Sequence, residues 1–131
     1  MRIEHWEDEL YAYIEASKDL QFEWGQNDCS LWAAAFVDNI TGSSIVNDWR
    51  GLYGDEDTAN LLMLERGFAN CEMVADSIAP SKSVKMASRG DIVLHQSGAL
   101  GICDGRKSFF LTPEKGLVSA LTVTCKKAWG I

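Results

Sequence analysis

Positive charge is scarce in this chain, which has 12 lysines and arginines against 19 aspartates and glutamates, for a formal net charge of −7. A nucleic-acid partner is disfavoured, because a protein that binds phosphates needs a basic face. Long apolar runs are also missing: no stretch reaches the roughly 18 apolar residues of a membrane-spanning helix, so we expect no membrane partner. The N-terminal stretch MRIEHWEDELYAYIEA lacks the basic-then-apolar order of a signal peptide. We therefore expect a cytoplasmic protein.

Metal ligands are equally sparse. No cysteine belongs to a C-x-x-C pair, and no histidine lies at metal-ligand spacing from a cysteine; the residues concerned are His5, His95, Cys29, Cys71, Cys103 and Cys125. The sequence therefore predicts no zinc site and no cofactor. In a reducing compartment the four cysteines are expected to be free thiols, most of them packed as small apolar residues.

What the chain does contain is enough apolar material for one core. Its 131 residues fit one domain, spanning 1–131, and the 47% hydrophobic and 24% charged residues are typical of a globular protein. In the first half, apolar spacing predicts helices at 3–17, 29–40, 56–66 and 71–78. The second helix, CSLWAAAFVDNI, is apolar nearly all round, which predicts that it is buried.

The pattern changes after Gly90 to short β-rich runs broken by glycine and proline. Residues 80–85 are expected to form a turn or linker before them. The predicted strands lie at 91–95, 99–105, 108–112, 116–123 and 126–130, with turns at 96–98 and 104–106. Helices first and antiparallel strands second predict an α+β domain, with the N-terminal helices packed on a C-terminal sheet.

Cys29 is the cysteine with the strongest case for chemistry. Asp28 is a natural N-cap for the helix that Cys29 begins, and Gly42 is a natural stop. A thiol at a helix N-terminus meets unpaired backbone N–H groups and the positive end of the dipole, which predicts a lowered pKa and a nearby oxyanion hole. The alternative is that Cys29 is only a small residue packed at a helix start.

A nucleophilic thiol needs a base, and only the two histidines are available. His5 lies among charged residues on the first predicted helix and is expected to be exposed. His95 ends a strand just before the turn at 96–98, so it should face Ala99 across a hairpin. Either His95 serves Cys29 as a base, or it is a solvated residue at a hairpin mouth.

The layout resembles the NlpC/P60 family of the papain-like cysteine peptidase superfamily, in which a cysteine starts a buried helix and a Gly-Asp strand leads into a hairpin. The matching residues here are Asp28-Cys29-Ser30, Gly90-Asp91-Ile92-Val93 and Ala99-Leu100-Gly101-Ile102. The chain is also similar to a group of small phage and prophage proteins of uncertain function. Shared with them are F-x-W-G-x-x-D-C from Phe22 to Cys29, Thr41-Gly42, Trp49-Arg50-Gly51-x-Tyr53, Gly90-Asp91, Gly101-Ile102, Gly116-Leu117 and Trp129.

The resemblance implies that Cys29 stands at the nucleophile position of enzymes that cut cell-wall peptides, with Asp28 and Ser30 as supporting neighbours. The family's base is a histidine that opens the second hairpin strand, where this chain has Ala99. The family's third polar residue would correspond to Ser108 or Thr112.

Two functions follow. In one, the chain is a cysteine hydrolase with His95 as base. In the other, which the missing histidine favours, catalysis is lost or weak and the protein is a structural, tail-associated phage component, cytoplasmic or carried in the virion. Other tail proteins or a cell-wall peptide would be the partners. Trp24, Trp49 and Tyr53 are then candidate cleft or partner contacts, the alternative being core packing. A ligand-binding role for the cleft stays open beside the structural one.

Overall fold

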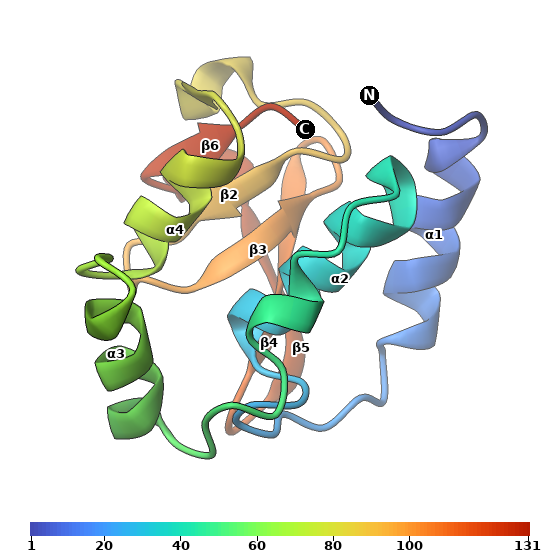
Figure 1. Cartoon of the computed structure of the whole chain (residues 1–131). Coiled ribbons are helices and arrows are strands. Elements are labelled where there is room, and N and C mark those ends of the chain that lie inside the picture. Colours follow the sequence, from blue (N-terminus) through green and yellow to red (C-terminus); the bar gives the residue numbers. More distant parts are fainter.

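Four α-helices and a six-stranded sheet follow one another along the chain in the computed structural model, which describes residues 1–131 (Figure 1). The helices are α1 (Trp6–Ala16), α2 (Cys29–Thr41), α3 (Glu56–Glu65) and α4 (Cys71–Ile78). The strands are β1 (Ser81–Lys82), β2 (Ile92–Leu94), β3 (Leu100–Cys103), β4 (Lys107–Thr112), β5 (Gly116–Leu121) and β6 (Lys127–Trp129). The α+β class and the helices-before-strands order are therefore confirmed.

The sheet has the order β1-β6-β2-β3-β4-β5, and every neighbouring pair is antiparallel. The predicted linker at 80–85 contains β1, because Ser81 and Lys82 pair with β6 at the edge of the sheet. Two residues are too few to show an alternating pattern in the sequence. None of the helices is long and apolar enough to cross a membrane.

Several predicted elements are shorter than expected, and two of them have a clear local cause. Helix α1 begins at Trp6, because His5 has left-handed backbone (φ 61°), and the segment before it extends so that the Ile3 N–H donates to the Ile40 carbonyl at 2.7 Å. The predicted strand 116–123 ends at Leu121, because Thr122 starts a short 3₁₀ turn. Both the N–H and the hydroxyl of Thr122 donate to the 105–106 turn, which draws the chain out of the sheet.

The sheet divides the core into two. The inner cluster joins α1, α2 and α4 to the sheet, and its largest buried side chains include Trp32, Phe36, Ile102 and Trp129. A smaller cluster lies on the outer face and consists of Val93, Cys103, Phe110, Cys125 and Ala128. Because side chains alternate along a strand, this division decides which strand residues can reach the N-terminus of α2.

Candidate functional site

The N-terminus of α2 is held by Asp28, which is the expected N-cap and is only 1% exposed. One carboxylate oxygen accepts from the Leu31 N–H at 2.9 Å. The other accepts from the Gly25 N–H at 3.1 Å and from the Tyr53 hydroxyl. Through these bonds the Asp28 carboxylate holds the start of α2 to the loops that contain Gly25 and Tyr53. Its role is therefore structural.

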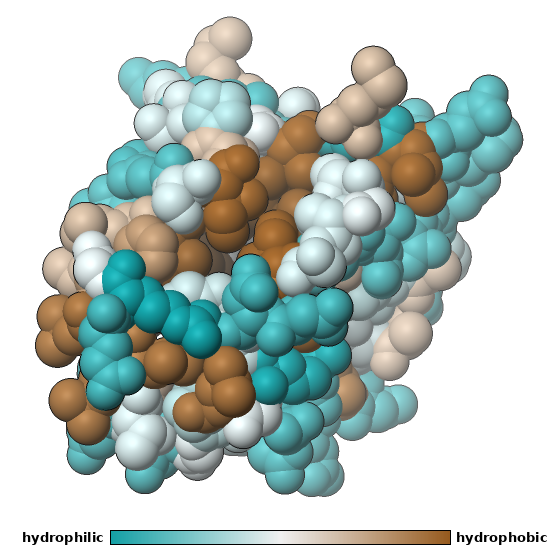
Figure 2. Space-filling model, viewed as in Figure 1, coloured by the Kyte–Doolittle hydropathy of each residue, from teal (hydrophilic) through white to brown (hydrophobic).

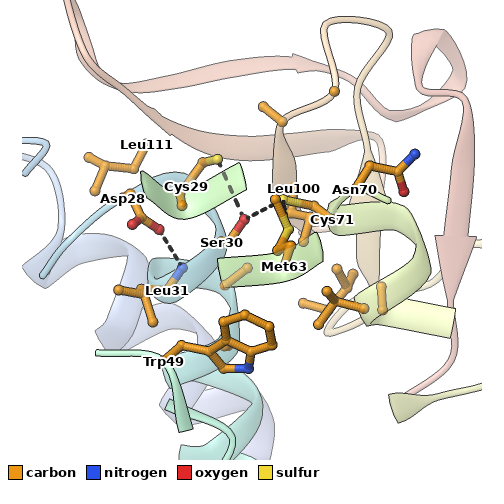
Figure 3. Close-up of a pocket in the computed structure, with 18 of the residues that line it drawn as sticks. Asp28, Cys29, Ser30, Leu31, Trp49, Met63, Asn70, Cys71, Leu100 and Leu111 are labelled. Carbon is orange, nitrogen blue, oxygen red and sulfur yellow. Dashed lines mark hydrogen bonds between the residues drawn. The ribbon is translucent and has the colours of Figure 1, made fainter. Parts of the chain in front are cut away.

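A cavity of about 490 Å³ opens beside this helix start, between α2, α3, α4 and the inner face of the sheet. Its wall is mainly apolar, since 23 of the 32 lining residues are hydrophobic. Figure 2 shows hydrophobic side chains gathered along a hollow on this face. Figure 3 shows Asp28, Cys29 and Ser30 at the cavity with Met63, Cys71 and Leu100. Such a cavity is suited to an apolar ligand or side chain that has polar contacts at one end.

Cys29 lines the cavity, as the cleft hypothesis requires, but its environment differs from the one expected. Burial, with a smaller contribution from the nearby Cys71, raises the pKa of the Cys29 thiol to about 11. Hydrogen bonds with the Leu100 backbone and with Ser30 lower the pKa only in part. The predicted lowering of the Cys29 pKa is therefore wrong, because desolvation outweighs the stabilisation that a helix N-terminus offers.

His95 lies elsewhere. The hairpin has the expected form, with the His95 N–H donating to the Ala99 carbonyl at 2.8 Å. The His95 ring, however, packs edge-on against Phe110 of the outer cluster, with 5.4 Å between ring centroids. Its Nδ1 accepts from the Ser97 N–H at 3.1 Å. His95 does not line the cavity; Ala99, its partner across the hairpin, borders the cavity and also packs against the outer cluster. The structure thus does not bring the proposed base and nucleophile together.

The two candidates for the third polar residue lie on different sides of the sheet. Ser108 is fully buried on the outer side of the sheet, where its hydroxyl lies 2.7 Å from that of Thr122. Side chains alternate along β4, and the neighbouring Phe109 faces the inner cluster. Ser108 therefore points away from the face of the sheet that Cys29 lies against. Thr112 does line the cavity, and its hydroxyl donates to the Gly116 carbonyl at 2.9 Å.

Three aromatic residues proposed as cleft or partner contacts form part of the cavity wall. Trp24, Trp49 and Tyr53 are each half-buried and line it. Trp24 packs edge-on against Phe22, and the Arg66 guanidinium lies 4.5 Å from the centre of the Trp49 ring. They are therefore cleft contacts, with part of each ring committed to packing.

Cys71 and Met63 are cavity residues that sequence reasoning did not select. Cys71 is the first residue of α4 and follows the N-cap Asn70, just as Cys29 follows Asp28. The Ser30 hydroxyl lies 3.2 Å from the Cys71 sulfur and 3.9 Å from the Cys29 sulfur. The signal for Cys71 in the sequence was the second occurrence of an N-cap residue followed by cysteine. Only the tertiary structure brings the two helix starts together.

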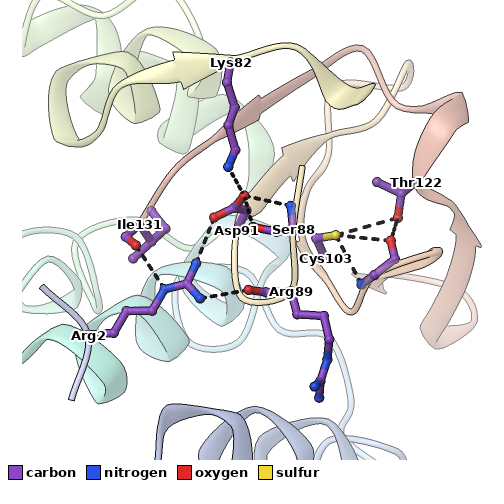
Figure 4. Close-up of polar contacts among 9 residues, drawn as sticks. Arg2, Lys82, Ser88, Arg89, Asp91, Cys103, Thr122 and Ile131 are labelled. Atoms are coloured by element: carbon purple, nitrogen blue, oxygen red, sulfur yellow. Dashed lines mark hydrogen bonds and ion pairs between the residues drawn. The ribbon is translucent and has the colours of Figure 1, made fainter. Parts of the chain in front are cut away.

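Asp91 and Arg2 bind the two ends of the chain to the sheet (Figure 4). Asp91 is 1% exposed and forms ion pairs with Arg2 at 2.8 Å and with Lys82 at 2.5 Å. Arg2 also donates to the carbonyl of Ile131 at 3.0 Å. Gly90 has φ 89°, and a Cβ there would lie 2.8 Å from the Arg2 guanidinium. Gly90 and Asp91 therefore support the fold, and neither residue lines the cavity.

Comparison with known proteins identifies one family. The chain belongs to the family described as "Domain of unknown function (DUF6950)", which it matches over residues 1–131. No curated protein matches the chain.

Proposed function

We propose that this protein is a binding or structural component with an NlpC/P60-like arrangement, in which hydrolysis is lost or weak and the cleft accepts an apolar group of a partner or ligand. The resemblance to small phage and prophage proteins supports an assembly role of the tail-associated kind. One observation carries the proposal: the cavity that holds Cys29 contains Ala99 and no imidazole.

The chemistry of the cavity supports loss of hydrolysis. With a Cys29 pKa of about 11, the thiol is protonated at neutral pH and needs a base to become a nucleophile. The His95 ring packs on Phe110 of the outer cluster and does not line the cavity. Alanine at position 99 cannot accept a proton. Binding, by contrast, requires only the apolar wall and a few polar groups at one end.

Hydrolysis is tested with purified protein and bacterial cell-wall stem peptides, comparing the wild type with C29S. We expect no peptide release by the wild type above that of C29S. Hydrolysis by the wild type that C29S abolishes would contradict the proposal, and its loss in H95A would establish the hydrolase alternative.

The missing base can also be restored. A99H adds an imidazole at the border of the cavity. Turned toward Cys29, its protonated form should stabilise the Cys29 thiolate and speed alkylation at pH 7 by about tenfold or more. H95A is the matched control, because it alters an imidazole outside the cavity and should leave Cys29 alkylation unchanged. An A99H rate equal to that of the wild type would show that position 99 does not face the thiol.

Binding is tested with a neutral apolar dye that fluoresces on entering a dry cavity. A34L narrows the cavity, because Ala34 lines it, whereas A35L changes the same helix at a half-buried position outside the lining. We expect the dye signal to fall in A34L and to persist in A35L. Equal signals in both variants would place the dye outside the cavity.

A further inference from the structure

Strand β5 forms one edge of the sheet, and part of its backbone has no partner. It pairs along its whole length with β4, and the pairing continues where the Thr122 N–H donates to the Arg106 carbonyl at 2.8 Å. Along an antiparallel pair, successive residues direct their N–H and C=O groups alternately toward the neighbouring strand and away from it. Leu117, Ser119 and Leu121 therefore direct theirs to the open edge, where their N–H groups have no acceptor within the chain.

The open edge of β5 carries none of the features that usually protect such a strand. Its sequence, GLVSAL, has no charged residue and no proline, and its register with β4 runs without a bulge. None of its six residues is buried, so the strand remains accessible. The opposite edge of the sheet is protected by its length, because β1 has only two residues. An unprotected edge strand such as β5 is a template for pairing with a further strand.

The residues of β5 are arranged symmetrically about Ser119. A shorter apolar residue stands next to it on each side, Val118 and Ala120, and a leucine stands beyond each of these, Leu117 and Leu121. If two copies of the strand lie antiparallel with their Ser119 residues facing each other, Leu117 lies opposite Leu121 of the second copy. Leucine then meets leucine, the two serine hydroxyls come within reach of each other, and no like charges meet. The sequence of this edge therefore favours a second copy of the chain over an unrelated strand.

The same register satisfies the open backbone groups. The pairs Leu117–Leu121 and Ser119–Ser119 bring together residues whose N–H and C=O groups point outward, so each becomes a hydrogen-bonded pair with two N–H···O=C bonds. Both faces of the sheet are continued as well, because Leu117 packs against the inner cluster, and Val118 and Ala120 pack against the outer cluster. Leu121, which is 45% exposed, gains the Leu117 side chain of the second copy as an apolar neighbour.

We propose that β5 is a dimerisation edge, at which two copies of this chain join their sheets across a two-fold axis at Ser119. Such an interface uses the same surface on both copies, so assembly ends at a dimer. A single pair of short strands buries less than about 1,200 Å² of surface, as weak interfaces do, so the dissociation constant should be micromolar or higher. The proposal does not rest on the proposed binding function, because no residue of β5 lines the cavity.

The test is sedimentation equilibrium of the purified chain between about 1 µM and about 1 mM. We expect the wild type to pass from monomer to dimer over this range. S119K places two lysines opposite each other at the axis and should lower the association constant at least about fivefold, although it makes each copy less negative overall. S81K is the matched control, because Ser81 is an exposed serine of the other edge strand and its substitution should leave association unchanged.

The position of the two-fold axis is tested with opposite charges. S119E should dissociate as S119K does, whereas an equimolar mixture of the two variants should form a one-to-one heterodimer, because lysine then faces glutamate. Both substitutions fall on an exposed side chain, so both variants should fold. Association of S119K equal to that of the wild type, or a mixture that associates no better than either variant alone, would overturn the proposal.

Hydrogen exchange of the wild type gives a measurement that needs no substitution. The amides of Leu117, Ser119 and Leu121 should exchange several-fold more slowly at about 1 mM than at about 1 µM. Those of Val118 and Ala120, which donate to β4, should be slow at both concentrations. A wild type that stays monomeric throughout would leave the edge to a strand of another protein, and protection independent of concentration would mean that the chain covers its own edge. Either result would overturn the proposal.

Discussion

Alkylation of Cys29 by iodoacetamide should be slow at neutral pH and should accelerate steeply in alkaline solution. The thiolate is the reactive form, and a free cysteine has a pKa of about 8.5. With a pKa of about 11, Cys29 carries about 300-fold less thiolate than a free cysteine at pH 7. The more basic thiolate is intrinsically more nucleophilic, which recovers about tenfold. The expected rate at pH 7 is therefore about 30-fold below that of a free thiol.

The assay measures labelling of each cysteine separately by peptide mass spectrometry between pH 6 and pH 10, with N-acetylcysteine as the reference thiol. The Cys29 rate should rise about tenfold for each pH unit across that range, because the thiol titrates above it. A plateau below pH 8, or a rate at pH 6 equal to that of the reference thiol, would refute the reasoning. Either result would mean that the cavity stabilises the thiolate and that burial does not dominate its pKa.

Three further outcomes follow from the packing and the ion pairs. G25A should lower the free energy of unfolding in urea by about 2 kcal/mol more than G42A, because both positions have φ near +77° but only at Gly25 would a Cβ clash with backbone, the Tyr53 carbonyl oxygen; equal losses would contradict this. D91A should cost about 2–3 kcal/mol, since it removes a buried carboxylate that pairs with the partly exposed Arg2 and Lys82, whereas D104A, which breaks an exposed pair, should cost less than about 1 kcal/mol in the same assay. Finally, the unfolded state loses the Cys29 proton at lower pH than the folded state, so the stability contributed by Cys29 should be complete below about pH 8 and fall by about 3 kcal/mol as the pH approaches 11; an unchanged pH dependence in C29S would contradict that assignment.

Features set by neighbouring residues could be predicted from the sequence. The bounds of α4 at Cys71–Ile78, the cap at Asp28 and the stop at Gly42 are as expected, because capping and left-handed backbone depend on a few adjacent side chains. The hairpin that pairs His95 with Ala99 is likewise local. The sequence thus determined the class of fold and the position of Cys29 at a helix start.

The tertiary structure alone decided what that position can do. Packing on Phe110 places the His95 ring on the outer face of the sheet. Burial raises the pKa of Cys29, whereas its position at a helix start predicted a lowered pKa. The contact of Ser30 with Cys71 and the pairing of Asp91 with Arg2 join residues that are far apart in the chain. Desolvation and long-range contacts depend on the whole packed surroundings of a group, whereas the sequence around it specifies only its local geometry.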